Sequence, residues 1–382
     1  VHIGATTTWF DRHGARIPAP ARLPIVVPHA AVELDGSADF TAKEIAEQPR
    51  AAAHLVDTLS GRLAGGELLR DLGVPTCRRV RMVACGSSYY AARIAAGMFA
   101  SMAGVPASVV IASELAAEVT EPGTLNIAFS QSGETADVLA AMDVLSGPWL
   151  AITNNPQASL ARRSDAVLGL GCGPEVGVAA TKSFTAQVVA AAALATSFGS
   201  ARRRLSRHQV RSVEQLLGTL PERLATTDER VAASAMALAD ELADTPAWLF
   251  VSRGLGVPYA MEGALKLKEL SYRWVEALPA GELKHGPIAL IQSGTPVVVV
   301  QSEPAERLAV SVSEMAARGA RIITVGTGPG VELPVELAQP KQPPWGPLEA
   351  VVAMQHLARE VAVRLGKAVD RPRNLAKSVT VE

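Results

Sequence analysis

The sequence predicts an α/β protein with two doubly wound parallel sheets in tandem, each forming a three-layer α/β/α unit. Its strand-like segments are almost continuously apolar, which is typical of parallel strands covered on both faces. They alternate with helical segments, and the alternation restarts near residue 246 with a new strand, a glycine-containing turn and a helix. A chain of 382 residues with 48% hydrophobic residues is long enough to build two such cores.

The first half is expected to begin with a helix over 43–63. The strands that follow are expected at 78–84, 107–112, 124–129, 148–153 and 165–170, and the helices at 87–103, 134–145 and 182–199. Ahead of this pattern, "TTTWFDRHGARI" at 6–17 places two β-prone runs around a polar turn, which predicts a hairpin.

A helical connector that begins with the arginine-rich "ARRRLSRHQVRS" is expected to expose its charges to solvent. The second half then predicts strands at 247–252, 295–300 and 320–325, one further short strand, and helices within 253–272 and near 304–318 and 347–366. The resulting organisation is a leader (1–42), a first unit (43–205), a connector (206–228), a second unit (229–366) and a tail (367–382).

Composition excludes several classes of function. The net charge of -1, from 36 basic and 37 acidic residues, creates no field that would attract nucleic acid or a membrane surface. Cys77, Cys85 and Cys172 have no CxxC spacing, so neither disulfides nor a zinc site are expected, and a reducing cytoplasm is favoured. No apolar run reaches roughly 18 residues, and no dinucleotide or P-loop motif is present. We therefore expect a small-molecule ligand, with no cofactor and no metal.

Two hydroxyl-rich loops follow predicted strands of the first unit. Ligands of doubly wound sheets bind at the carboxyl ends of the strands, and backbone N–H groups at helix N-termini favour anions. Neither loop contains Lys or Arg, so a phosphate monoester is favoured over a triphosphate. The alternative is simple N-capping by Ser132 or Gly133 ahead of Glu134. The loop residues that could hold a phosphate are Ser87, Ser88, Ser130, Gln131, Ser132 and Thr135.

The second unit contributes ionisable groups. Glu262, Lys266 and Glu269 have i, i+4 and i+7 spacing and therefore share one face of a helix that is apolar around much of its circumference. Exposed salt bridges are the ordinary explanation of such a pattern. A Lys–Glu pair on a largely buried helix is instead a candidate for proton transfer. His285 lies in a later turn, where a lone histidine is usually a bystander.

Taken together, these motifs resemble the isomerase half of the glutamine–fructose-6-phosphate aminotransferases, also called glucosamine-6-phosphate synthases. That half consists of two sugar isomerase (SIS) domains with a flavodoxin-like fold, and the resemblance covers about residues 40–382. The leader is similar to the last hairpin of the family's glutaminase domain. The loops occur in many SIS proteins, whereas the tail points to the synthases. The segments concerned are "CGSSYYAA", "SQSGETAD", "GVAATKSFTAQ", "EGALKLKELSY", "AGELKHGPIALI" and "PRNLAKSVTVE".

The resemblance implies a role for each candidate residue. The loop residues would hold the 6-phosphate of a hexose, and Val178 and Ala376 would line the sugar pocket. Glu269 would move a proton between C1 and C2, with Lys266 as its charged neighbour. His285 would assist ring opening in the site of a partner subunit, which implies a homodimer with shared sites. Lys377 would meet the sugar carbonyl.

The sequence also departs from the family. Ala180 stands where a Ser is usual, Trp274 where a His is common, and Ser87 where a Thr is usual. The first cysteine is Cys77, so the cysteine that hydrolyses glutamine is missing from the chain. We therefore expect the chain to be either a fragment of a longer enzyme or a stand-alone protein that uses free ammonia or a separate glutaminase.

Three hypotheses remain open at this point. The first is a synthase-type module of amino-sugar biosynthesis, which makes glucosamine 6-phosphate from fructose 6-phosphate and ammonia. The second is a glucosamine-6-phosphate deaminase or a ketose–aldose phosphate isomerase. The third is a sugar-phosphate sensor without catalysis. The ionisable residues disfavour the sensor, since binding alone needs only the loops.

Overall fold

The computed structural model describes residues 2–3, 7–10, 14–19, 33–75, 77–115, 121–302, 305–338 and 342–380. The chain divides into a small unit, Val1–Glu33, and a large unit, Leu34–Glu382. The small unit contains three short antiparallel strands, β1 (His2–Ile3), β2 (Thr7–Phe10) and β3 (Arg16–Ile17). Pairing of β2 with β3 confirms the predicted hairpin. The strand β1 was not predicted.

The first sheet of the large unit is parallel and has the order β5-β4-β6-β7-β8. Its strands agree with the predicted ones to within one residue at each end. They are β4 (Arg79–Ala84), β5 (Ala107–Ile111), β6 (Thr124–Phe129), β7 (Trp149–Thr153) and β8 (Ala166–Gly169). The helices of this half are α1 (Phe40–Ala46), α2 (Gln48–Leu59), α3 (Glu67–Asp71), α4 (Gly86–Met98), α5 (Ala136–Val144), α6 (Ser159–Arg163) and α7 (Lys182–Ala201).

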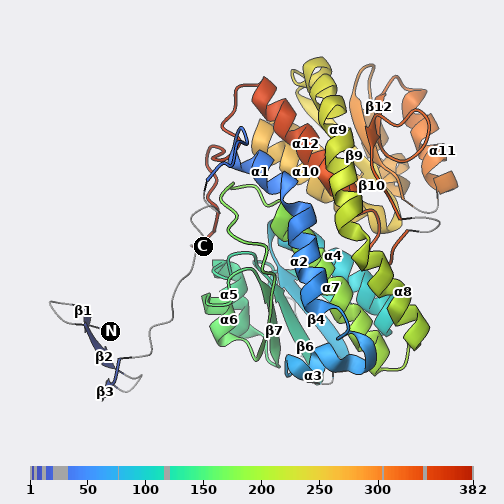
Figure 1. Cartoon of the computed structure of the whole chain (residues 1–382). Helices are drawn as coiled ribbons and strands as arrows, with labels where there is room; N and C mark the ends of the chain where they lie inside the picture. Colours follow the sequence, from blue (N-terminus) through green and yellow to red (C-terminus); the bar gives the residue numbers. More distant parts are fainter. Residues whose placement is uncertain are drawn as a thin grey trace. The chain divides into compact units, whose positions relative to one another are not determined.

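The second sheet repeats this order as β10-β9-β11-β12-β13, again with every pair parallel. In both halves the first strand in the chain lies second in the sheet, which is the flavodoxin-like 2-1-3-4-5 arrangement. The strands are β9 (Ala247–Ser252), β10 (Trp274–Pro279), β11 (Pro296–Val300), β12 (Arg321–Gly326) and β13 (Leu333–Pro334). The helices are α8 (Arg207–Gly218), α9 (Leu220–Leu242), α10 (Val257–Ser271), α11 (Ala305–Ala316) and α12 (Ala350–Arg364). The predicted tandem α/β fold is therefore confirmed (Figure 1).

Three sequence expectations need correction. The helix expected over 43–63 is divided into two helices, α1 and α2. Pro49 has no N–H to donate within a continuous helix, and it lies instead in the first turn of α2. The edge strand β10 was missed, since Glu276 and Pro279 interrupt its apolar pattern. The position 228, where the connector was expected to end, lies inside the continuous helix α9.

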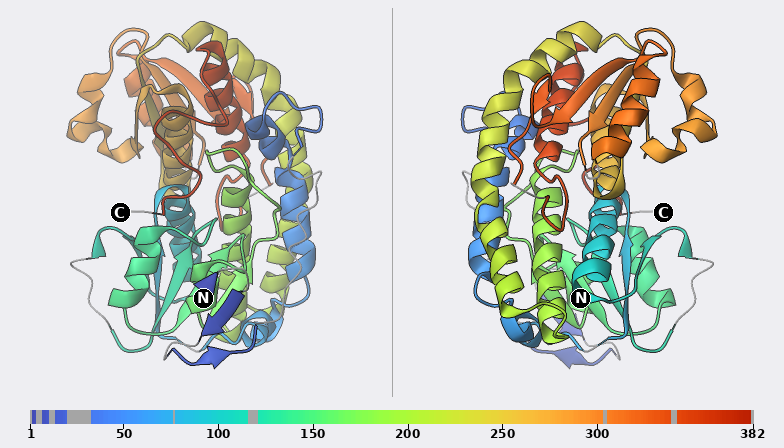
Figure 2. Two further views of the ribbon diagram at one scale, coloured as in Figure 1. Left: turned by 90° about the vertical axis from the view of Figure 1, so that its left-hand side faces the viewer. Right: turned by 90° about the vertical axis from the view of Figure 1, so that its right-hand side faces the viewer.

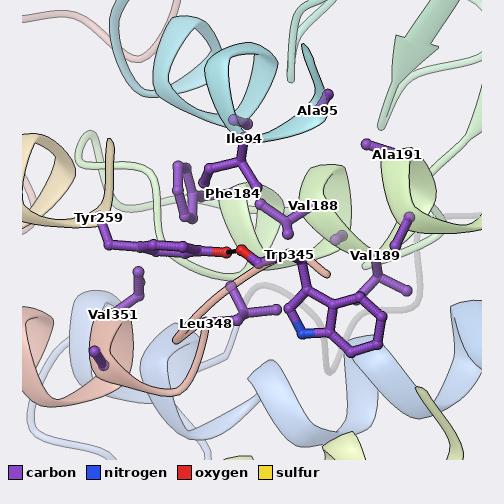
Figure 3. Close-up of a cluster of buried hydrophobic side chains, with 14 of the residues drawn as sticks. Ile94, Ala95, Phe184, Val188, Val189, Ala191, Tyr259, Trp345, Leu348 and Val351 are labelled. Carbon is purple, nitrogen blue, oxygen red and sulfur yellow. Dashed lines mark hydrogen bonds between the residues drawn. The ribbon is translucent and has the colours of Figure 1, made fainter. Parts of the chain in front are cut away.

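One hydrophobic core joins the two halves. Its centre is α7, in which every residue from Lys182 to Gly199 is buried. Figure 3 shows Phe184, Val188 and Val189 of α7 packed against Ile94 of α4 and against Trp345. The hydroxyl of Tyr259 in α10 donates to the Trp345 carbonyl at 2.6 Å. Because α7 contacts both halves, the core fixes α10 against the first sheet's helices.

The helix α7 also has the length and composition of a membrane span. It is the one such helix among the described ranges, with a mean hydropathy of 1.3. However, 89% of the apolar segment of α7 is buried inside the protein, as expected for a core helix.

Helix α10 is also packed tightly against its neighbour α12. A Cβ at Gly263 of α10 would overlap the Met354 sulfur of α12. Close contact between α10 and α12 therefore depends on glycine at this position.

Candidate functional site

The two hydroxyl-rich loops lie side by side at the carboxyl edge of the first sheet. One follows β4 and the other follows β6, and these two strands pair directly. Both turns require glycine, because Gly86 and Gly133 have φ of 55° and 69°. A Cβ at Gly133 would also lie only 2.5 Å from the Ala158 Cβ. The two glycines therefore allow the tight turns that keep both loops at the sheet edge.

Hydroxyl groups of the second loop bond to one another and to backbone N–H groups. Ser130 Oγ lies 2.9 Å from Thr135 Oγ1 and accepts from the Gly133 N–H at 3.1 Å. Ser132 Oγ accepts from the Glu134 N–H at 3.2 Å. The N-capping interpretation is wrong, because α5 begins at Ala136 and its N-cap residue is Thr135, which makes no side-chain cap bond. Gln131 is half-buried beside these hydroxyls.

The first loop faces α7 and α10. Ser88 Oγ accepts from Gln187 Nε2 of α7 at 2.9 Å. Ser87 interacts with the carboxyl group of Glu262 in α10. The helices α4 and α10 pack against each other. The hydroxyl loops of the first half are thus brought next to the ionisable helix of the second half.

Glu262, Lys266 and Glu269 form one cluster on α10. Lys266 Nζ lies 2.5 Å from Glu269 Oε2 and 3.6 Å from Glu262 Oε1. The side chains of Glu262 and Lys266 are 0% and 1% exposed, whereas that of Glu269 is 22% exposed. These values exclude exposed surface salt bridges as the explanation. Glu269 is the member of the cluster that a ligand can reach.

Burial and charge determine how the cluster titrates. Burial raises the pKa of Glu262 to about 8, against the opposing charge of Lys266. Burial lowers the pKa of Lys266, but the carboxylates of Glu269 and Glu262 outweigh it and the net shift is upward. The ammonium of Lys266 therefore stays charged beside Glu269. Glu269 is thus a carboxylate that a ligand can reach, with a fixed cation beside it, and this position makes it the candidate to accept and return a proton.

The tail reaches the first half through Lys377. Its Nζ lies 2.6 Å from Glu175 Oε2, and the Glu175 side chain is 0% exposed. Glu175 also accepts from the N–H groups of Thr181 and Ser183, both at 3.0 Å, and from Ser183 Oγ at 2.7 Å. Although burial acts to raise the pKa of Glu175, the Lys377 charge and these donors lower it to about 2. Glu175 is thus a permanent anion that holds the tail lysine.

Other tail contacts surround this pair. The Val178 N–H donates to the Asp370 carbonyl at 3.1 Å, and the Ala136 N–H at the start of α5 donates to the Val379 carbonyl at 3.0 Å. The second contact places the end of the tail beside the 130–135 loop. Figure 2 shows the red C-terminal segment returning from α12 toward the first sheet. Ala376 is exposed, next to Lys377.

The SIS domain profile matches residues 76–197 and 241–334, which contain the two parallel sheets. The chain belongs to the SIS domain family. The glutamine–fructose-6-phosphate aminotransferase of Halobacterium salinarum is 39% identical over 374 residues, covering 91% of this chain and 62% of that protein. The enzyme of Caulobacter vibrioides is 38% identical, covering 98% of this chain and 64% of that protein. This SIS chain therefore spans less than two thirds of the length of these relatives.

Solved structures agree with this assignment. The C-terminal domain of glucosamine-fructose-6-phosphate aminotransferase from Francisella tularensis matches with a TM-score of 0.81 at 32% identity, covering 89% of this chain and 100% of that one. Glucosamine-6-phosphate deaminase from Thermotoga maritima shares the fold, with a TM-score of 0.70 at 24% identity. The SIS chain is thus homologous to the isomerase half of the aminotransferases.

Some residues that the sequence singled out in this SIS chain do not belong to the Glu262–Lys266–Glu269 cluster. His285 is exposed at the end of a 3-10 helix, Ala280–His285, that packs against β10 and α11 of the second half. Trp274 is 84% exposed, and Ala180 is half-buried. Among the described residues, no cluster of three His, Cys, Asp or Glu side chains could hold a metal ion.

Sequence reasoning missed Glu175. It lies in "GCGPEVG" at 171–177, a glycine-containing segment that does not have the GxGxxG spacing of a dinucleotide-binding motif. One feature of the sequence could have indicated it. Glu175 is a single acidic residue among glycines after a strand, whereas the other loops of the first half carry hydroxyl groups. Its partner Lys377 is 202 positions away in the chain, so the pair itself leaves no local pattern.

Glu175→Gln and Glu262→Gln are expected to alter the pH dependence of stability in opposite directions. Folding lowers the pKa of Glu175 from 4.5 to about 2, so its stabilising contribution is present above pH 4.5 and is lost as the pH falls toward 2. Folding raises the pKa of Glu262 from 4.5 to about 8, so its contribution is present below pH 4.5 and is lost as the pH rises toward 8.

Urea unfolding of both variants and the unmodified chain, at several pH values between about 3 and about 8.5, measures these contributions. The deficit of Glu175→Gln should shrink toward acid pH, and that of Glu262→Gln should shrink toward alkaline pH. Deficits that vary with pH in the same direction would contradict the two assignments.

Proposed function

We propose that this chain is a sugar-phosphate isomerase module that converts fructose 6-phosphate and ammonia into glucosamine 6-phosphate and water. The main support for the proposal is that three kinds of group lie near one another. They are the hydroxyl groups of the two loops, the buried Lys266–Glu269 pair and the tail lysine Lys377. The relatives from Halobacterium salinarum and Caulobacter vibrioides, which are glutamine–fructose-6-phosphate aminotransferases, support the same reaction.

In the proposed mechanism the loops bind the 6-phosphate. Ser88, Ser130, Gln131, Ser132 and Thr135 supply side-chain donors, and Ser87 lies alongside. The backbone N–H groups at the start of α5 add a favourable dipole for the phosphate charge. Val178 and Ala376 line the sugar pocket. These contacts place the sugar carbons beside α10 and the tail.

The chemical step then needs an imine and a proton carrier. Lys377 contacts the C2 carbonyl of the open-chain sugar. Ammonia adds to this carbonyl carbon, and water is lost. The resulting C2 imine acidifies the C1 hydrogen, which Glu269 removes and returns to C2. As C2 receives this proton, the O1 hydroxyl loses its proton and the nitrogen gains one, so the product carries an aldehyde at C1 and an amine at C2. Lys266 stabilises the Glu269 carboxylate before the first proton transfer and again after the second, when Glu269 has given up its proton.

His285 acts in trans in this proposal. Its exposure, at the end of a 3-10 helix that packs against β10 and α11, fits a role in the site of a partner subunit, where it assists ring opening. The active form is then a homodimer with two equivalent sites. Nitrogen arrives as ammonia, either free or released by a separate glutaminase, in a cytoplasmic setting.

The deciding assay incubates the purified chain with fructose 6-phosphate and ammonium and measures glucosamine 6-phosphate. A parallel reaction starts from glucosamine 6-phosphate and measures fructose 6-phosphate and ammonia. We expect interconversion in both and no hydrolysis of glutamine. Exchange of ketose and aldose phosphates without incorporation of nitrogen would support the simple isomerase instead. Binding without any turnover would support the sensor.

Ser132→Ala is expected to weaken binding of fructose 6-phosphate by about 10- to 100-fold, because a hydrogen bond to a charged group contributes roughly 1.5–3 kcal/mol. The matched control is Ser164→Ala at the end of α6, where the lost hydroxyl donates only to the Leu160 carbonyl. Calorimetric titration compares the two variants. Similar losses in both would remove Ser132 from the phosphate site.

Glu269→Gln and His285→Ala chains are expected to be inactive separately and to recover activity when mixed. A mixed dimer assembles one site that contains both native groups. Random exchange of subunits gives half mixed dimers with one good site of two, so recovery should approach about a quarter of the normal activity. Absence of recovery, with exchange shown by mass-tagged subunits, would assign His285 to its own chain.

A further inference from the structure

We propose that Glu44 is a positioning residue for the tail, which fixes loop 176–178 so that the tail carrying Lys377 docks in one place. The inference rests on the proposed function, in which Lys377 meets the sugar carbonyl. Glu44 belongs to α1, was given no role in the sequence analysis, and is 1% exposed.

The carboxylate of Glu44 holds the backbone of loop 176–178. Its Oε1 accepts from the Val176 N–H, and both of its oxygens accept from the Gly177 N–H at 3.3 Å. The loop has no regular secondary structure here, so these donors have no strand or helix partner to satisfy them. Buried N–H groups that lose their acceptor are costly, and a carboxylate can accept from both.

The fit between α1 and the loop is close. A Cβ at Gly177 would lie 2.9 Å from Glu44 Oε2 and 3.1 Å from Thr41 Oγ1. Glycine therefore allows the loop backbone to approach the carboxylate. Any larger residue at this position would push the loop away from α1.

The loop and α1 then hold the tail at Asp370. The Val178 N–H donates to the Asp370 carbonyl at 3.1 Å. On the α1 side, the Asp370 carboxylate accepts from the Phe40 N–H at 2.9 Å, the Thr41 N–H at 2.8 Å and Thr41 Oγ1 at 2.9 Å. The tail is thus fixed at Asp370, seven positions before Lys377.

A second anchor lies at the other end of the same loop. Glu175 is held by donors at the start of α7 and binds Lys377. Glu44 holds the next two residues, Val176 and Gly177, and Val178 is thereby presented to the tail. Without Glu44 the Glu175 and Asp370 anchors remain, but the loop backbone between them loses its acceptor and no longer presents Val178 to the tail in one position.

Charged groups from several elements act on Glu44. Glu175 of the loop disfavours its ionised form, whereas Lys377 of the tail and Lys182 of α7 favour it. On α12, Arg359 pairs with Asp39 at the start of α1. Burial, with Glu175 next in effect, raises the pKa of Glu44 to about 7. Since an ionised acceptor makes stronger hydrogen bonds, the hold on the loop weakens as the pH falls below about 7.

The test compares Glu44→Gln with Glu349→Gln, a control that neutralises an equally buried carboxyl. Glu349 is 0% exposed and bonds to Arg223 at 2.6 Å, in contact with neither the loop nor the tail. Two readouts need no turnover. One is hydrogen-exchange protection of the Val176, Gly177 and Val178 amides, and the other is the rate at which an acylating reagent labels Lys377.

In Glu44→Gln we expect protection of these amides to fall about tenfold or more and labelling of Lys377 to accelerate, with neither change in the control. In the unmodified chain, protection at Val176 and Gly177 should decrease as the pH is lowered through about 7, and Glu44→Gln should lose this dependence. Glu44→Asp keeps the charge and should restore part of the protection. If Glu44→Gln does not fold, Gly177→Ala perturbs the same contact from the loop side and should give the same changes.

The kinetic readout separates positioning from general damage. Misplacement of a reacting group by about 1 Å lowers the rate roughly 100-fold, so kcat should fall by about 10- to 100-fold in Glu44→Gln. Affinity for sorbitol 6-phosphate, which has the phosphate but no carbonyl, should change less than about twofold, since the phosphate loops are untouched. Unchanged protection and labelling, or an unchanged kcat with a loosened tail, would overturn the proposal.

Failure of the proposed function gives a different result. An unmodified chain without turnover on either substrate removes the reaction assigned above. The protection and labelling experiments still decide whether Glu44 fixes the tail, because they measure the folded chain alone.

Discussion

A single core shared by the two sheets is the constraint on which the rest of the molecule depends. Each half repeats the same strand order, yet neither half alone contains both the hydroxyl loops and the ionisable helix. The buried helix α7 packs against elements of both halves, and α10 is held between α4 and α12. This packing removes Glu262 and Lys266 from water. The electrostatics of the candidate site are therefore a consequence of how the core is built.

Burying several charges together is costly unless they are paired. The structure meets this requirement with alternating signs. Lys266 lies between two carboxylates of α10, Lys377 binds Glu175, and Lys182 binds Glu47 at 2.5 Å. The pKa values of the buried carboxyl groups then differ because their surroundings differ. Glu175 accepts several short hydrogen bonds and has a pKa of about 2, whereas Glu262 has only Ser87 and the more distant Lys266 near it among the described residues, and burial raises its pKa to about 8. Such separation of pKa values distinguishes groups that hold charge from groups that exchange protons.

Local patterns explain how much of this was predictable. The apolar runs of β6 and β7 and the turn chemistry after β6 depend on neighbouring residues, so the sequence indicated both the sheet and the loop. The i, i+4, i+7 spacing also placed Glu262, Lys266 and Glu269 on one face before any contact was known. Edge strand β10 lacks a continuous apolar run because only part of it is buried. Its pairing with β9, rather than its own composition, makes it a strand.

Long-range contacts explain what the sequence could not indicate. Glu44 and Val176 are 132 positions apart, and Glu175 and Lys377 are 202 positions apart. No periodicity within a helix or strand encodes such pairs. In α1 the side chain of Glu44 looked like an ordinary polar residue of an amphipathic helix, and only the approach of a glycine-containing loop turns it into a buried acceptor. The functional groups that sequence reasoning finds most easily are those that share an element.

The two halves also differ in how they use the same position of the fold. After β6 the hydroxyls of Ser130, Ser132 and Thr135 lie at the sheet edge, around the N-terminus of α5. After β9 and β11, the equivalent strands of the second sheet, the hydroxyls are used internally: Ser252 Oγ donates to the Val300 carbonyl at 2.7 Å and Ser302 Oγ to the Arg253 carbonyl at 2.6 Å. The second half instead directs α10 toward the first sheet. In the proposed function the two units have separate tasks, the first holding an anion and the second supplying proton chemistry, and the shared core keeps them together.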